Sequence, residues 1–395
     1  MKTAKLGYLV RFRNGQDAKS VESPDGEYPI IGSGGEFSRA NSFLHDGESL
    51  LFGRKGTIDR PLHVNGKFWT VDTMYFTEIG PEVSGRYLYY WATTIPFDKI
   101  STQTALPSMT SFKLSQLEVP LPDLRTQRRL ADYLDRETAQ IDAMAGALDG
   151  LVARLEERRH ATLVDSITRS GELLGGVATR SDYWPPIQKE WHVVRLGNLG
   201  SVQSGIALGS KKYSEGKEYP YLRVANVQDG SLDLSNVKTL RIPESVAIKY
   251  KVPENSVLMT EGGDRDKLGR GTIWRNEISD CLHQNHIFAF RCGNRITPEY
   301  LSFVLESQPA RMYFDLTASQ STNLATTSSF KVKSFPLPLP PLDEQRRIVD
   351  HLDAETVKID AMIAKAGELR SLLDERRSAL ITAVVTGQHP VPKEP

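Results

Sequence analysis

The sequence predicts an α+β protein in which two similar globular domains are joined and spaced by two long antiparallel coiled-coil helices. Three observations predict this fold. The chain contains an internal repeat, short β-type runs fill the first part of each half, and apolar residues follow a heptad spacing near the end of each half. Each half is therefore one α+β domain followed by one long helix, and we expect a pseudo-twofold axis to relate the halves.

The internal repeat covers 58 residues. Residues 111–168 align without a gap on residues 329–386, at a constant shift of 218 positions, with 26 identities. Solenoid repeats have periods of about 20–50 residues. A period of 218 residues therefore indicates that a whole domain and its appended helix were duplicated.

Short β-type runs bounded by Gly, Asn, Asp and Pro precede each helix. They include YPIIGSGG and SLLFGRKGTI in the first half, and YPYLRVANV and HIFAFR in the second. They predict a mixed or antiparallel sheet in each domain. The second domain is about 28 residues longer between equivalent landmarks, so we expect insertions near 209–219 and 261–270, in loops of the kind that usually carry recognition.

A proline-rich segment separates each domain from its helix, because Pro120, Pro122 and the prolines from 336 to 341 exclude helical backbone. Asp135 and Asp353 occupy positions where an N-cap would divide each helical region into a short helix (near 125–134 and 343–352) and a longer one (near 136–167 and 354–385). The predicted domains are 1–119, then 120–175 with the first helices, 176–337, then 338–388 with the second helices, and a disordered tail at 389–395.

Apolar residues recur at alternating spacings of three and four in both long helices, with the same phase in the two copies. One such stripe on a surface helix would normally pack on its own domain. Two stripes, each too long and narrow to be covered by one domain, favour an antiparallel pair of helices. The predicted seam residues are Ile141, Met144, Leu148, Leu151, Leu155, Ile359, Met362, Ala366, Leu369 and Leu373.

Composition predicts a globular, cytoplasmic protein without a membrane span. Hydrophobic residues make up 39% of the chain and charged residues 25%. Two cysteines argue against a disulfide framework, and the N-terminus lacks the apolar run of a signal peptide. The 49 Lys and Arg balance the 49 Asp and Glu, whereas a free-standing nucleic-acid binder usually carries a basic excess. If the chain binds DNA, we expect partners to supply much of the positive surface.

Motifs for enzyme activity are missing or incomplete. An adenine methyltransferase needs an Asn/Asp-Pro-Pro-aromatic tetrad, and the chain offers only Trp184-Pro185-Pro186-Ile187. GIALGSKK, at Gly205–Lys212, has the wrong spacing for a phosphate-binding loop. Glu215-x-Lys217 lacks an upstream Pro-Asp, which argues against a nuclease.

Two further clusters are expected to be structural. Cys281, His283, His286 and Cys292 have the side-chain types of zinc ligands, but residues that alternate along a β-type run point to opposite faces. We therefore expect no metal site. Gly32-x-Gly34-Gly35 predicts a tight turn rather than a nucleotide site.

The repeated helical regions resemble those of the specificity subunits of type I restriction-modification systems. The resemblance rests on PLPDLRTQRR…LD…E…IDAM…LEERR and PLPPLDEQRRIVDHLDAETVKIDAM…LDERR, at both of the family's positions. It implies two target-recognition domains, each reading one half of a bipartite asymmetric DNA site. It also implies that the helices set the spacing and dock modification subunits. The second domain follows a lead-in, WPPIQKEWHVVRLG, that we expect the first domain to lack.

The resemblance further implies a non-catalytic chain without a cofactor of its own. Two modification subunits would hold S-adenosylmethionine and flip adenines out of the duplex, and restriction/translocase subunits would use ATP. A helix of about 30 residues spans roughly 45 Å, so half-site centres should lie about 10–12 base pairs apart. Two alternatives remain: the specificity subunit of a modification system without a motor, or a coiled-coil scaffold whose domains bind proteins.

Loop residues with cationic, amide or hydroxyl side chains are the candidates for DNA contact, because Arg pairs with guanine and Asn or Gln with adenine in the major groove. Taken singly, such a residue is more often a solvated charge. Ser108–Ser111 and Ser319–Ser329 could contact phosphates or form plain polar loops. The candidates for DNA contact are Arg54, Lys55, Thr57, Arg60, Lys211, Lys212, Tyr213, Arg223, Asn226, Gln228, Arg265, Lys267 and Arg270.

Overall fold

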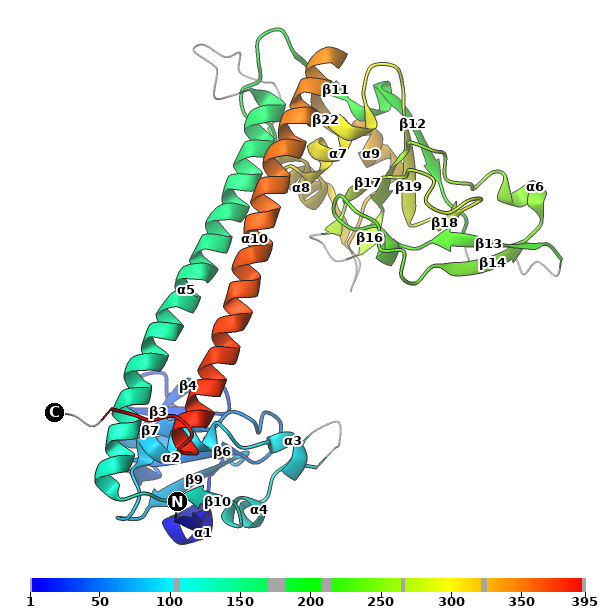
Figure 1. Ribbon diagram of the computed structural model, residues 1–395. Helices are drawn as coiled ribbons and strands as arrows, with labels where there is room; N and C mark the ends of the chain where they lie inside the picture. Colours follow the sequence, from blue (N-terminus) through cyan, green and yellow to red (C-terminus); the bar gives the residue numbers. More distant parts are fainter. Residues whose placement is uncertain are drawn as a thin grey trace. The chain divides into compact units, whose positions relative to one another are not determined.

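The computed structural model describes residues 2–102, 107–169, 182–207, 215–263, 267–320 and 325–392. The chain divides into two compact units: unit 1 is Met1–Gly150 with Ala366–Pro395, and unit 2 is Leu151–Lys365. Each unit combines one α+β domain with part of each long helix, α5 (Leu124–Thr168) and α10 (Leu342–Val385) (Figure 1). The boundary between the units therefore lies within the two long helices.

Within its described residues, unit 1 contains two four-stranded sheets and one two-stranded ribbon. The first sheet is antiparallel, in the order β2 (Val10–Asn14), β9 (Met74–Ile79), β6 (Ser49–Gly53), β7 (Leu62–Val64). The second has the order β4 (Gly35–Ala40), β3 (Tyr28–Gly32), β8 (Lys67–Thr70), β5 (His45–Asp46), with β3 parallel to β8. The remaining elements are the ribbon of β1 (Thr3–Lys5) and β10 (Glu118–Pro120), and the helices α1 (Leu6–Leu9), α2 (Gly85–Ala92), α3 (Phe97–Ile100) and α4 (Ser111–Ser115).

Unit 2 repeats this plan and adds a small sheet. The antiparallel sheet has the order β12 (Gly200–Ser204), β19 (Ile287–Cys292), β15 (Val257–Thr260), β17 (Gly271–Ile273), and the mixed sheet the order β14 (Lys238–Ile242), β13 (Lys217–Leu222), β18 (Leu282–His283). β11 (His192–Arg195) pairs with β22 (Pro336–Leu339), and the added sheet is β16 (Gly262–Gly263), β21 (Ala325–Thr326), β20 (Ser319–Gln320). The helices are η2 (Leu196–Asn198), η3 (Val224–Asn226), α6 (Glu244–Ala247), α7 (Pro298–Glu306), α8 (Gln308–Thr317) and α9 (Ser329–Ser334).

The strand orders of the two units match, which confirms the predicted duplication of an α+β domain. In both units the antiparallel sheet runs in the same order, and the mixed sheet contains one parallel pair, β3 with β8 and β13 with β18. The small sheet of unit 2 uses residues from the predicted insertion near 261–270.

The predicted break in each helical region is wrong, because α5 and α10 continue through Asp135 and Asp353. The N-cap of α5 is Asp123, whose Oδ1 accepts a hydrogen bond from the Thr126 backbone N at 3.0 Å. Asp135 makes side-chain contacts instead. Its carboxylate accepts a hydrogen bond from the Tyr90 hydroxyl at 2.7 Å and forms an ion pair with Arg86, both on α2.

Ion pairs confirm that α5 and α10 run antiparallel within each unit. In unit 1, Arg377 Nε lies 2.9 Å from Asp142 Oδ1, and Arg370 Nε lies 3.4 Å from Asp149 Oδ2. Residue numbers therefore rise along α5 as they fall along α10. In unit 2, Arg159 Nε lies 3.1 Å from Asp360 Oδ1, and Arg169 forms an ion pair with Glu344. Residue numbers again rise along one helix as they fall along the other.

The predicted seam is correct at alternate positions. Ile141, Leu155, Ile359 and Ala366 are buried, and Leu148 and Leu373 are half-buried. The prediction is wrong for four other seam residues, whose side chains are 40–55% exposed: Met144, Leu151, Met362 and Leu369. Their neighbours Ala145, Val152, Ile363 and Arg370 lie on the less exposed side. Three of these four neighbours are also apolar, so the spacing alone did not decide between the two phases.

A buried glutamine joins each domain to its long helix. In unit 1, Gln127 Oε1 accepts a hydrogen bond from Ser84 N at 2.9 Å, and Nε2 donates to the carbonyls of Glu82 and Pro122. Gln345, 218 positions later, repeats this pattern in unit 2 with Thr297 N, Arg295 O and Pro340 O, each at 2.9 Å. Both glutamines are fully buried. These hydrogen bonds satisfy buried backbone groups of the loop before α2 in unit 1 and before α7 in unit 2. Each loop is thereby held against its long helix, α5 or α10.

The residues after α10 fold back onto unit 1. His389 stacks on Tyr133, with ring centroids 5.8 Å apart, and its Nε2 lies 3.1 Å from the Tyr133 hydroxyl. Val391 packs against the core of this unit. The predicted disordered tail is therefore wrong for residues 389–392, while 393–395 lie outside the described residues.

Candidate nucleic-acid interface

In unit 1 the structure brings the GRKGTIDR loop beside the Ser/Thr-rich segment that precedes α4. Met109 N donates to Arg54 O at 3.0 Å, and Gly56 N donates to Pro107 O at 3.0 Å. Lys55 and Ser108 form an antiparallel β-bridge between these bonds. We call residues 54–60 and 107–110 composite loop 1. Two groups of candidates that lie far apart in the sequence thus share one surface.

The cationic side chains of composite loop 1 differ in how firmly they are held. Arg54 is half-buried, and its guanidinium carbon lies 5.9 Å from the centroid of the Tyr75 ring, a cation–π distance. Lys55, Thr57 and Arg60 are exposed. The loop therefore presents one oriented arginine and three exposed polar groups.

Unit 2 builds the corresponding surface in the same way. β16 and β21 pair, and Thr327 N donates to Glu261 O at 2.7 Å, a bond equivalent to that between Met109 and Arg54. We call residues 261–263, 267–270 and 325–328 composite loop 2. Lys267 is exposed and Arg270 is half-buried. Arg265, Lys211, Lys212 and Tyr213 lie outside the described residues.

Three other candidates of unit 2 belong to a folded turn. Asn226 is 2% exposed, its Oδ1 accepts from Arg223 N at 2.8 Å, and its Nδ2 donates to Asp233 O at 2.8 Å. The prediction that Asn226 reads adenine is therefore wrong, because its amide is already bonded in the interior. Arg223 donates to Asn236 O at 3.0 Å, and Gln228 donates to Ala225 O at 2.8 Å. These side chains stabilise the turn.

The hydroxyls of the Ser/Thr-rich segments also have structural partners. Thr110 accepts from Lys113 N and caps α4, and Ser328 accepts from Lys331 N and caps α9. Thr102 Oγ1 lies 2.9 Å from Ser108 Oγ. Residues 321–324 of the second segment lie outside the described residues.

The residues with metal-ligand side chains do not form one cluster. His283 is fully buried, with Nδ1 2.9 Å from Ile287 O, and burial lowers its pKa to about 4. His286 Nδ1 lies 3.0 Å from Glu261 Oε2, and burial raises the pKa of Cys281 to about 12. Within the described parts of the chain, no three His, Cys, Asp or Glu residues are placed to hold a metal ion.

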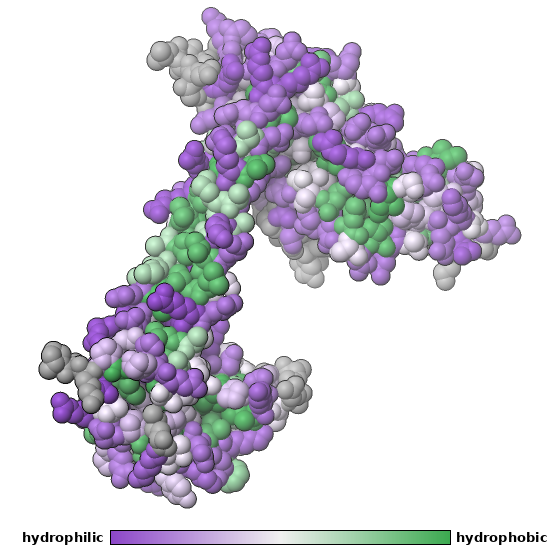
Figure 2. All heavy atoms as spheres, in the orientation of Figure 1, coloured by the Kyte–Doolittle hydropathy of each residue, from purple (hydrophilic) through white to green (hydrophobic). Residues whose placement is uncertain are grey.

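Both units expose apolar side chains that sequence reasoning assigned to the interior or did not consider. Along the helices, unit 1 exposes Met144, Leu369 and Leu372, and unit 2 exposes Leu151, Val357 and Met362. We call each set an apolar strip, and Figure 2 shows apolar surface along α5 and α10. On the domains, Phe112 of α4 and Phe330 of α9 are 72% and 76% exposed. Their signal in the sequence was the repeated Ser-Phe-Lys.

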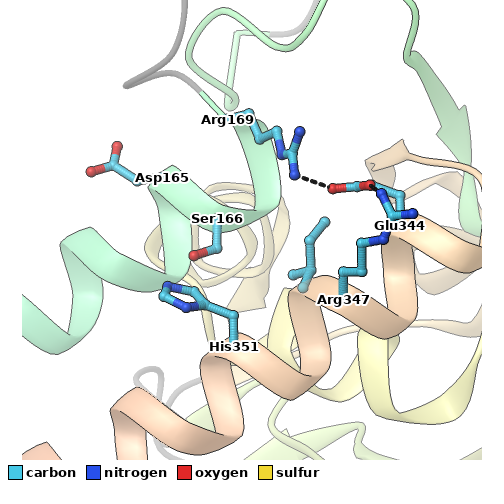
Figure 3. Close-up of a pocket in the computed structure, with 7 residues that line it drawn as sticks. Asp165, Ser166, Arg169, Glu344, Arg347 and His351 are labelled. Atoms are coloured by element: carbon cyan, nitrogen blue, oxygen red, sulfur yellow. Dashed lines mark hydrogen bonds and ion pairs between the residues drawn. The ribbon is translucent and has the colours of Figure 1, made fainter.

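A polar pocket of about 350 Å³ lies in unit 2 where α5 ends and α10 begins (Figure 3). Arg169 forms an ion pair with Glu344, and Arg347 Nη1 lies 3.1 Å from Glu344 Oε2. In unit 1, the residues equivalent to Ile348 and His351 are Leu130 and Tyr133, where His389 stacks on Tyr133. Because oppositely charged groups of the pocket are paired with each other, we do not assign it a charged ligand.

A protein-family model described as Type I restriction modification DNA specificity domain matches residues 1–151 and 188–365. The chain belongs to this family. This specificity subunit is 22% identical over 360 residues to the EcoKI specificity subunit of Escherichia coli K12. The match covers 87% of this chain and 76% of that protein. It is 24% identical over 313 residues to the StySPI specificity subunit of Salmonella potsdam, covering 77% of this chain and 66% of the relative.

Solved structures share the fold of this specificity subunit. The HsdS subunit from Thermoanaerobacter tengcongensis matches with a TM-score of 0.51, 15% identity, and coverage of 98% of this chain and 97% of that one. A chain from a structure on complex assembly and conformational transition of the type I restriction-modification system matches with a TM-score of 0.66, 15% identity and 97% coverage of both chains. Family membership identifies a DNA sequence-recognition subunit, and neither alternative from the sequence is favoured. No helix in the described ranges has an apolar stretch sufficient to cross a lipid bilayer.

Proposed function

We propose that each domain of this specificity subunit reads one half of a bipartite asymmetric site in double-stranded DNA, through its composite loop. The supporting observation is that the two loops share one backbone arrangement but differ in side chains. The same hydrogen bond joins Met109 to Arg54 and Thr327 to Glu261, so an arginine in unit 1 corresponds to a glutamate in unit 2. Two loops with the same backbone arrangement but different side-chain donors and acceptors are suited to reading different bases.

The apolar strips are the proposed docking sites for two modification subunits, one on each unit. Met144 and Met362 are equivalent under the shift of 218 positions, as are Leu151 and Leu369, and all four are exposed. Clustered exposed apolar residues usually mark a protein interface. The zero net charge of the chain agrees with this assignment, because a DNA complex then needs cationic surface from its partners.

In this proposal the chain is not an enzyme, and it acts in the cytoplasm on duplex DNA. The modification subunits hold S-adenosylmethionine and transfer its methyl group, and restriction/translocase subunits hold ATP. The lengths of α5 and α10 set the number of base pairs between the half-sites. The specificity subunit determines where the partners act.

The test is a map of methylated adenines in cells that express the complete system with altered loops. Replacing Arg54 and Lys55 by alanine should relax one half-site and leave the other unchanged. Lys267→Ala in composite loop 2 should relax the other half-site and leave the first unchanged. Arg241→Ala, an exposed arginine of β14 paired with Glu218, is the control and should change neither. A loop variant that alters both half-sites, or an unchanged map for every loop variant, would contradict the proposal.

A further inference from the structure

Phe112 and Phe330 are equivalent exposed aromatic residues on the two domains. They lie 218 positions apart, each between a serine and a lysine, and they are 72% and 76% exposed. An exposed phenylalanine is unfavourable in water, and a single one needs no explanation. The same exposed residue at the start of both copies of the repeat, residues 111–168 and 329–386, does.

The helices that carry these residues are short and firmly held. Leu114 of α4 and Val332 of α9 are fully buried, and each helix begins at a side-chain cap, Thr110 or Ser328. A Cβ atom added at Gly7 would lie 2.9 Å from Ser115 Cβ, and one added at Gly197 would lie 2.9 Å from Lys333 Cβ. The chain at each glycine therefore packs directly on the helix. Each phenylalanine projects from a fixed support.

Each phenylalanine also lies next to a composite loop. Phe112 follows Met109 by three residues, and Phe330 follows Thr327 by three residues, so the Cα atoms in each pair are within about 11 Å of each other. Met109 and Thr327 are the residues bonded to Arg54 and Glu261. The aromatic side chain is thus within reach of a duplex held by the loop.

The charges of these helices favour an anionic partner. α4 carries Lys113, α9 carries Lys331 and Lys333, and neither helix contains an acidic residue. An apolar side chain next to a lysine suits the edge of a duplex, where phosphates lie beside apolar sugar and base-step surface. The apolar strips on α5 and α10 lie among charges of both signs instead, since Lys358 beside Val357 pairs with Glu355.

We propose that Phe112 and Phe330 each contact the DNA duplex as an apolar wedge, in the minor groove or at a base step beside the half-site, and add affinity without adding sequence preference. The inference rests on the proposed function. Two domains that read different half-sites cannot distinguish them with an identical residue. The two phenylalanines must therefore contact a feature common to both half-sites.

The experiment uses the complex assembled with modification subunits, and short duplexes with or without the full site. Phe112→Ala and Phe330→Ala should each weaken binding of both duplexes about tenfold, and the double variant about a hundredfold, from the size of aromatic contacts with bases. The dependence of affinity on salt should not change, since no charge is lost. Phe112→Trp should restore binding, and Leu316→Ala, at a 64% exposed leucine of α8, is the control that should have no effect.

Four results separate the explanations. A map of methylated adenines with the same sequence in both halves, but with fewer sites modified, supports the inference. Unchanged affinity in the double variant overturns it. Loss of bound modification subunits, with DNA binding lost only as a consequence, also overturns it and identifies a protein contact. If the wild-type complex recognises no bipartite site, the proposed function itself fails, which differs from a failure of the phenylalanine variants alone.

Discussion

The buried glutamine of unit 2 allows a stability prediction with a built-in control. Gln345→Leu keeps the approximate side-chain volume but removes the hydrogen bonds to Thr297 N, Arg295 O and Pro340 O. Each group left unsatisfied costs about 1–3 kcal/mol, and the leucine regains about 1 kcal/mol of apolar burial. We therefore expect unit 2 to lose about 2–8 kcal/mol of unfolding free energy, which lowers its urea midpoint by roughly 1 M or more.

The assay is hydrogen exchange with mass spectrometry over a urea series, because it follows each unit separately. Gln345→Leu should lower the midpoint of peptides from unit 2, and Gln127→Leu should do the same in unit 1. Gln116→Leu removes an exposed hydrogen bond to Lys5 and should leave both midpoints unchanged. The reasoning is refuted if Gln345→Leu leaves the midpoint of unit 2 in place, or if it lowers both units equally.

The remaining predictions concern spacing, pH and assembly. Four residues inserted between Gly146 and Gly150 lengthen α5 by about 6 Å, close to two base pairs. The methylated site should gain one or two spacer bases, and an unchanged spacer in an active protein would exclude the helices as the ruler. Because burial lowers the pKa of His283 to about 4, the unfolded chain binds a proton that folded unit 2 does not. Stability should fall by about 1.4 kcal/mol per pH unit as pH drops from about 6.5 towards 4, and the urea midpoint of His283→Gln should show a smaller fall. Met144→Glu or Met362→Glu should each yield complexes with one modification subunit instead of two, which native mass spectrometry would detect.

The fold was largely predictable because its main signals are local or repeated. Prolines near 120 and 336–341 locate the start of each helical region, and the shift of 218 positions relates the two domains. The phase of the helix seam was not predictable, since Met144 and Ala145 are both apolar and only their burial in the structure distinguishes them. The predicted helix break at Asp135 was wrong because of a contact that is distant in the sequence. Its carboxylate binds Tyr90 on α2, a contact across 45 positions that a local capping rule does not include.

The candidate site was predictable by residue type but not by arrangement. Arg54, Lys55 and the Ser/Thr-rich segment were all identified, yet their pairing depends on backbone hydrogen bonds between segments more than 50 residues apart. Asn226 was assigned to DNA because amides can read adenine, whereas its burial depends on a turn that ends at Asn236. Phe112 and Phe330 were not predicted, because donors and acceptors that can pair with bases are polar, and an exposed phenylalanine has neither.

The core of unit 1 is completed by residues near the end of α10. Ile381 and Val384 of α10 belong to the same buried cluster as Leu6 and Leu9. The residues of the corresponding core of unit 2 all fall between positions 163 and 352 of the sequence. At roughly 5–20 residues per second, the first domain leaves the ribosome tens of seconds before its last core residues. The second domain can therefore finish folding before the first, because its core residues all precede Ile381 and Val384 in the chain.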